Sequence, residues 1–118
     1  FSLFVILMRK AYSRDLKELK NWSEAVSSFG REKQRRMLTY FLHIVRENFM
    51  YNFRLQEINY MTREEEDFAQ NFARFINERN VVEISEMLQR TIRDIGQNAN
   101  AKIQFFNLAT DMIIYLRR

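Results

Sequence analysis

Apolar residues recur every three or four positions through most of this chain, the spacing that places them on one face of an α-helix. Polar and charged residues fill the positions between them. Five such stripes follow an opening segment, residues 1–12, that is apolar nearly all round and predicts a helix buried on most sides or packed against a neighbour. The five stripes are Leu16, Leu19, Trp22, Val26 and Phe29; Leu38, Phe41, Leu42, Val45 and Phe49; Phe68, Phe72, Phe75 and Ile76; Val81, Ile84, Leu88, Ile92 and Ile95; and Phe105, Ala109, Met112, Ile113 and Leu116.

Capping signals set the expected limits of these helices. Ser13 is a candidate cap for the second helix, which we expect to end at Gly30. Thr62 with Glu65 predicts a capping box, and Asn80 with Glu83 predicts a cap for the helix that ends at Gly96. The predicted helices therefore cover 1–12, the stretch from Ser13 to Gly30, 31–51, the stretch from Thr62 to about 77–80, the stretch from Asn80 to Gly96, and a last one that begins after Asn98 or Asn100.

The longest connection, residues 52–61, shows no helical period. Its apolar residues alternate as in an extended segment, so one side is expected to pack on the bundle. Three aromatic residues flank or lie in this loop and are candidates for a contact surface, whereas most other aromatic residues fall on the core stripes. These candidates are Tyr51, Phe53 and Tyr60.

The chain has no proline and only two glycines in 118 residues, which argues for long helices and few turns. With the stripes, this predicts an all-α, compact bundle of about six helices that forms one domain over residues 1–118. The chain opens at Phe1 without an initiator methionine, so we expect a piece of a longer protein. The absence of cysteine excludes disulfides and thiolate metal sites and fits a reducing compartment, by default the cytoplasm. The apolar opening is too short to span a bilayer.

The net charge is +4, and the surplus of lysine and arginine is concentrated in residues 1–36. Four of them lie in the first turns of the 31–51 helix, where they oppose the helix dipole. They fit either an ordinary solvated face or a nucleic-acid-binding surface, to which Lys102 would add. These four candidates for an interaction or DNA-proximal surface are Arg31, Lys33, Arg35 and Arg36.

No pattern in the sequence predicts a catalytic, metal or cofactor site. His43 is the only histidine and has no partner pattern for a triad or metal site, so a structural or surface role is expected. The acidic run 64–67 has no EF-hand spacing, and its place at a helix start accounts for it. Glycines at 30 and 96 alone exclude a phosphate-binding loop. We therefore expect no enzyme activity and no small-molecule substrate for this domain.

Two segments are more specific than the bundle pattern: Phe-Gly-Arg-Glu-Lys-Gln at 29–34 and Asn-Ala-Asn-Ala-Lys at 98–102. With Arg-Glu-Asn at 46–48 and Phe-Ile-Asn-Glu-Arg-Asn at 75–80, they make the whole chain resemble the C-terminal domain of delta-prime subunits of bacterial DNA polymerase III clamp loaders, in a Bacteroidetes-type form. Asn98, Asn100 and Lys102 match the family's Asn-x-Asn-x-Lys motif. Ala101 replaces the proline frequent in the family, which leaves Asn100 as the expected N-cap.

The resemblance implies a collar domain: five AAA+-type loader subunits associate through such helical domains during the loading of the sliding clamp on primed DNA. The implied partners are the delta and gamma or tau subunits of the polymerase holoenzyme, with DNA reached through the whole complex. Nucleotide-binding modules would lie in another part of the parent protein. The alternative is a helical nucleic-acid-binding module that uses the basic N-terminal face.

Overall fold

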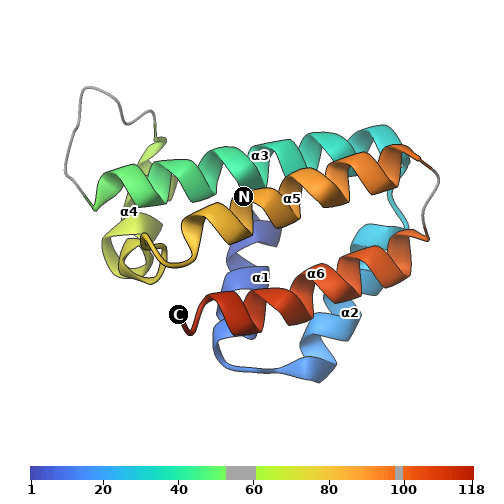
Figure 1. Ribbon diagram of the computed structural model, residues 1–118, viewed down its shortest axis with the longest axis horizontal. Helices are drawn as coiled ribbons and strands as arrows, with labels where there is room; N and C mark the ends of the chain where they lie inside the picture. The colour runs from blue at the N-terminus through green and yellow to red at the C-terminus, as the bar shows by residue number, and fades with distance from the viewer. Residues whose placement is uncertain (53–60, 98–99) are drawn as a thin grey trace.

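A computed structural model describes residues 1–52, 61–97 and 100–118, and within these ranges the chain is all-helical, with six α-helices and one short 3-10 helix. Figure 1 shows the helices and their order. This confirms the predicted all-α class and the number of helices. The elements are α1 (Ser2–Tyr12), α2 (Leu16–Ser27), α3 (Arg31–Tyr51), α4 (Arg63–Phe72), η2 (Ala73–Phe75), α5 (Val81–Gly96) and α6 (Ala101–Tyr115).

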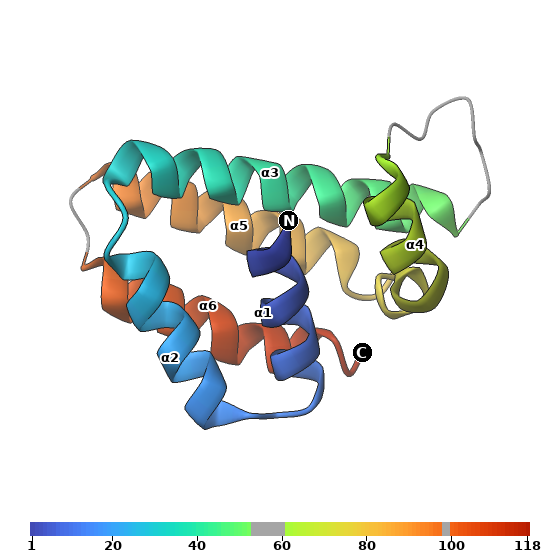
Figure 2. The ribbon, with the colours of Figure 1, turned by 180° about the vertical axis from the view of Figure 1, so that it is seen from behind.

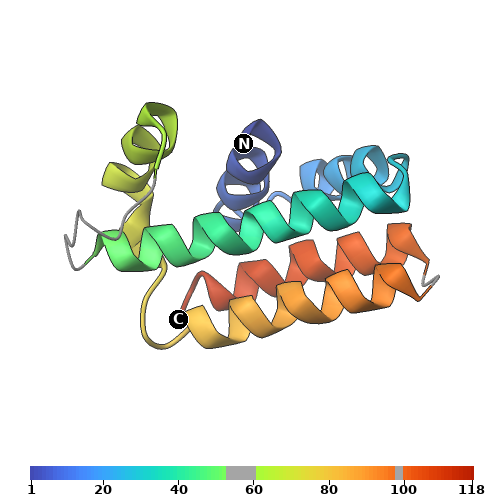
Figure 3. The same cartoon turned by 90° about the horizontal axis from the view of Figure 1, so that it is seen from above.

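The longest helix, α3, is the centre of the arrangement. It lies along α5, which runs in the opposite direction, and α6 turns back along α5 (Figures 1 and 2). In Figure 3, α1, α2 and α4 lie on one side of α3. Helices that are far apart in the sequence are thereby brought together, since α2 packs along α6 and α1 also contacts α6.

Trp22 on α2 lies where several of these helices meet. Its ring is 6.0 Å from that of Phe105 on α6 and 6.4 Å from that of Phe41 on α3, measured between centroids. Its indole Nε1 donates a hydrogen bond of 3.1 Å to the carbonyl oxygen of Leu3 on α1. The side chain is buried, so this bond satisfies a polar group that burial would otherwise destabilise.

Helix caps agree with the sequence in two places. Thr62 and Glu65 form the predicted capping box: Thr62 Oγ1 accepts from the Glu65 N–H at 3.2 Å, and Glu65 Oε1 accepts from the Thr62 N–H at 2.8 Å. Asn100 caps α6, because its Oδ1 accepts from the N–H of Ile103 at 3.2 Å. Both satisfy amide groups that have no partner inside the helix.

The predicted cap at Ser13 is wrong, whereas Asn80 occupies the predicted N-cap position of α5 without making a side-chain capping bond. Asp15 caps α2 by accepting from the N–H of Glu18, while Ser13 follows the end of α1. Between them Arg14 has a φ of 58°, a left-handed conformation that turns the chain sharply. Asn80 precedes α5, but its side chain makes no capping bond and reaches the backbone of other segments instead.

Asn80 joins two parts of the chain through its buried amide group. Its Nδ2 donates to the carbonyl oxygens of Phe75 at 2.8 Å and Tyr115 at 2.9 Å, and its Oδ1 accepts from the N–H of Asn77 at 2.9 Å. Asn52, after α3, donates similarly to the carbonyl oxygens of Ala73 and Ile76. The η2 turn is therefore held from both sides, and α4 ends at Phe72 rather than near 77–80.

Two expected core positions are exposed. Leu16 lies on the predicted stripe of α2 but is 56% exposed, because it is the first residue of the helix. Ile6 on α1 is 43% exposed, so this helix is not covered on all sides. The remaining stripe residues are buried or pack against the core, as the periodicity predicted.

Candidate functional site

The four candidate cations at the start of α3 are all exposed, but they do not act as one cluster. Lys33 Nζ lies 4.2 Å from the centre of the Phe29 ring, a cation–π contact that turns it toward the α2–α3 connection. Arg35 and Arg36 instead line a shallow hollow with Ile92 of α5. The Arg35 guanidinium also covers Gly96, since a Cβ built there would lie 3.7 Å from its Cζ.

Two further arginines, Arg90 and Arg93, are exposed on α5 and line a separate hollow with Glu86. Because α5 is antiparallel to α3, they approach the end of α5 beside which Arg35 and Arg36 lie. Sequence reasoning missed this pair, since only the packing of the two helices relates residues 35–36 to residues 90–93. The four residues are called the α3–α5 arginine surface below.

Lys102 lies outside the α3–α5 arginine surface. Its Nζ is 3.9 Å from Glu24 Oε1 of α2, an exposed ion pair of small energy. It borders a groove of about 350 Å³ between α2 and α6 that also contains Lys20, Ile103 and Phe106. Ile103 is 56% exposed there, which leaves an apolar side chain at the surface. We call this the α2–α6 groove.

A larger groove of about 580 Å³ separates α1 from α4. One face of each helix lines it, and the lining combines apolar and charged side chains. This α1–α4 groove is defined by Val5, Ile6 and Arg9 of α1 and by Glu64, Asp67 and Phe68 of α4, together with flanking residues of the same faces.

The remaining predicted site residues are only partly within the described ranges. Tyr51 is the last residue of α3 and is half-buried. Phe53, Tyr60 and Asn98 lie outside the described residues, so the predicted aromatic contact surface and the first asparagine of the motif stay predictions. His43 is exposed on α3, as a surface role requires.

Glu65 and Tyr40 form a charged contact that the sequence did not predict. The Tyr40 hydroxyl donates to Glu65 Oε2, while Glu65 Oε1 accepts from Thr62. Burial raises the pKa of Tyr40, and the hydrogen bond and negative charge of Glu65 raise it further. Burial alone would raise the pKa of Glu65, but the hydrogen bonds from Tyr40 and Thr62 and the charge of His43 outweigh it and lower the pKa.

This contact is suited to structure rather than to proton transfer. Both oxygens of the Glu65 carboxylate already accept hydrogen bonds, and its lowered pKa makes it a weaker base. The raised pKa of Tyr40 keeps its hydroxyl protonated. The pair therefore fastens the start of α4 to the middle of α3.

Across residues 1–52, 61–97 and 100–118, no three histidine, cysteine or acidic side chains are grouped closely enough to hold a metal ion. Of the described helices, none combines the length and apolar character needed to cross a membrane. The chain matches no protein-family model, no curated protein and no solved structure in the comparisons made.

Proposed function

We propose that this domain is a subunit-assembly domain without enzyme activity or cofactor, of the kind that forms the collar of a bacterial clamp loader. Its partners would be the delta and gamma or tau subunits in the cytoplasm, where the assembled loader places the sliding clamp on primed DNA. The resemblance of segments 29–34 and 98–102 to delta-prime subunits motivates this choice.

The observation that supports assembly best is the presence of two separate grooves that expose apolar side chains. Ile6 lies in the α1–α4 groove and Ile103 in the α2–α6 groove, on different helix pairs. A domain held between two neighbours in a ring needs two contact faces, and apolar side chains with charged rims are typical of such faces.

Co-purification with the delta and gamma or tau subunits tests the proposal. We expect co-elution at a fixed stoichiometry, measured by size-exclusion chromatography with light scattering at moderate salt. Replacing Ile103 by glutamate is expected to weaken association by about tenfold, because a buried apolar contact becomes a charge. The exposed position of Ile103 means that the fold, checked by circular dichroism, should survive. A wild-type monomer that binds none of these subunits would contradict the proposal.

The α3–α5 arginine surface favours a second candidate function, binding of nucleic acid through phosphate groups. Arg35, Arg36 and Arg90 make no ion pair with any residue in the described part of the chain, whereas Arg93 contacts Asp94 at 3.3 Å. Unpaired arginines on neighbouring helices can contact successive phosphates, and binding of this kind weakens steeply with salt. Binding through phosphates in this way does not require a recognition helix that reads the bases.

The double variant Arg35→Glu with Arg36→Glu tests this alternative. We expect its affinity for single-stranded DNA to fall by about tenfold or more. The slope of log affinity against log salt concentration should also become shallower, by the amount expected for about two fewer phosphate contacts. Fluorescence anisotropy over a salt series measures both. Lys17→Glu with Arg79→Glu changes the net charge equally away from this surface and is the matched control. Equal losses of affinity in the two double variants, or binding that does not depend on salt, would contradict nucleic-acid binding by the α3–α5 arginine surface.

A further inference from the structure

The α1–α4 groove has the shape of a channel between two short helices that rise from the same side of α3 (Figure 3). The groove is lined by Phe1 and by positions 2, 5, 6 and 9 of α1, and on the other side by positions 64, 67, 68, 71 and 72 of α4. Both series follow the helical period, so one continuous face of each helix forms a wall. With 10 residues, α4 is about 15 Å long, so the wall that it forms matches about three turns of a third helix.

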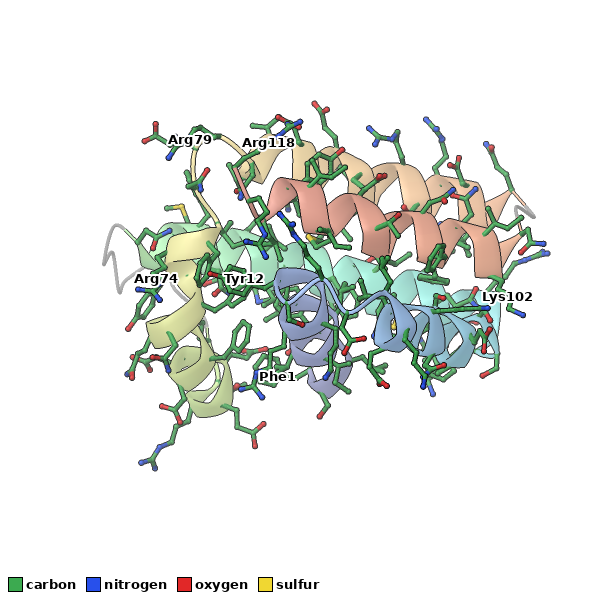
Figure 4. All side chains as sticks on the ribbon, turned by 90° about the horizontal axis from the view of Figure 1, so that it is seen from below. Phe1, Tyr12, Arg74, Arg79, Lys102 and Arg118 are labelled. Carbon is green, nitrogen blue, oxygen red and sulfur yellow. The ribbon has the colours of Figure 1, made fainter. Side chains whose placement is uncertain are left out.

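Aromatic and aliphatic side chains form the apolar part of this channel. The ring of Phe68 lies 5.9 Å from those of Phe1 and Phe4 and 4.9 Å from that of Phe72. Figure 4 shows Phe1 at the N-terminal end of α1. Ile6 is 43% exposed on the opposite wall, which places an apolar side chain next to solvent. Phe4 and Phe72 are already buried, so a partner would gain by covering Ile6 and the partly exposed ring of Phe68.

The α4 wall of the channel is acidic, although the chain as a whole has a positive net charge. The chain carries +4, yet Arg63, the first residue of α4, is followed by four consecutive acids, of which the exposed Glu64 and Asp67 border the channel. Arg9, on the α1 wall, is the one cationic side chain among the residues that line it. Nucleic acid would be repelled by the α4 wall, whereas lysine or arginine side chains would be attracted to it.

The α4 wall is fixed before any partner arrives. The capping box closes the start of the helix, and Glu65 is also bound to Tyr40 of α3. At the other end, Asn52 and Asn80 hold the η2 turn that follows α4. A preformed wall lowers the entropic cost of binding.

We propose that the α1–α4 groove binds an amphipathic helix of a partner protein, with its apolar side chains against Ile6 and Phe68 and its lysine or arginine side chains beside Glu64 and Asp67. The recognition mode is a helix in a groove between two helices. The inference rests on the proposed assembly role only in that the partner helix belongs to another protein of the complex.

Two synthetic helical peptides provide the probe. They share one leucine-rich face and differ only in the flanking residues, which are lysine in one and glutamate in the other. We expect the lysine peptide to bind about tenfold more tightly, measured by fluorescence anisotropy, because two acidic groups border the groove. Ile6→Glu is expected to weaken the lysine peptide by about tenfold through loss of the apolar anchor.

A charge change in the groove sharpens the test. The double variant Glu64→Gln with Asp67→Lys is expected to remove or reverse the preference for the lysine peptide. Glu78→Gln with Glu86→Lys makes the same change in net charge outside the groove and should keep the preference. Thermal unfolding of each variant verifies that it is folded. Equal affinity for the two peptides, or equal effects of both double variants, would overturn the inference.

Two further outcomes separate the groove from its alternatives and from the assembly role. A concentration-dependent dimer that Asp67→Lys disrupts, detected by light scattering, would assign the groove to a second copy of this chain and overturn the partner-helix proposal. If the loader subunits bind wild type and Ile6→Glu equally and neither peptide binds, the groove inference fails while assembly stands. If the lysine peptide binds more tightly than the glutamate peptide but no loader subunit co-purifies, the groove inference stands and the assembly proposal fails.

Discussion

Replacing Asn80 by alanine is expected to lower the free energy of unfolding by about 3 kcal/mol, because three partly buried backbone groups lose a hydrogen-bond partner at once. These groups are the carbonyl oxygens of Phe75 and Tyr115 and the N–H of Asn77. The Asn80 side chain is fully buried, so water cannot replace it without opening the turn. Urea unfolding followed by circular dichroism measures the loss.

Asn77 provides the matched control for this prediction. Its Oδ1 accepts only from the exposed N–H of Arg79, at 2.8 Å, so Asn77→Ala is expected to cost about 0.5 kcal/mol. Similar losses for the two alanine variants would show that Asn80 does not join η2 to the end of α6. Asn80→Asp is a second check, since it keeps the shape but loses both amide donors.

Replacing Glu65 by alanine is expected to cost about 2 kcal/mol at neutral pH, because the Tyr40 hydroxyl and the Thr62 N–H both lose their acceptor. The same contact makes stability depend on pH. The pKa of Glu65 is lowered in the folded protein, so its contribution is complete above the ordinary glutamate pKa of about 4.3 and is lost as the pH falls through the folded value.

Thermal unfolding of wild type and Glu65→Gln between neutral and acidic pH measures this contribution. The wild type should be the more stable protein at neutral pH, and the difference should shrink as the pH falls below the ordinary glutamate pKa. Glu66→Ala, which removes an exposed acid from the same helix, should change stability little and leave the pH dependence in place. A constant difference between wild type and Glu65→Gln at every pH would contradict the role given to the carboxylate.

Features that depend on local spacing were predictable from the sequence. The predicted helix 31–51, with its stripe from Leu38 to Phe49, matches α3, and the capping box at Thr62 and the cap at Asn100 involve groups only three residues apart. Such contacts form within one turn of the chain and need no knowledge of packing.

Features that join distant segments were not predictable. Glu65 was expected as a local cap, but its second oxygen binds Tyr40, 25 residues earlier in the chain. Asn80 was expected to cap α5, yet one of its partners is 35 residues away. The α1–α4 groove and the arginine pair on α5 likewise depend on which helices become neighbours. Helical periodicity states which side of a helix is buried, but not which helix covers it.

The position of Trp22 between α1, α3 and α6 has a consequence for the order in which the molecule forms during synthesis. Its ring contacts Phe105, so the face of α2 that carries Trp22 is completed by a helix near the other end of the chain. A ribosome therefore releases α2 long before the helix that covers it has been translated. The nascent chain must keep an uncovered tryptophan face until α6 emerges, and the completed fold is reached only after nearly all of the domain has left the exit tunnel.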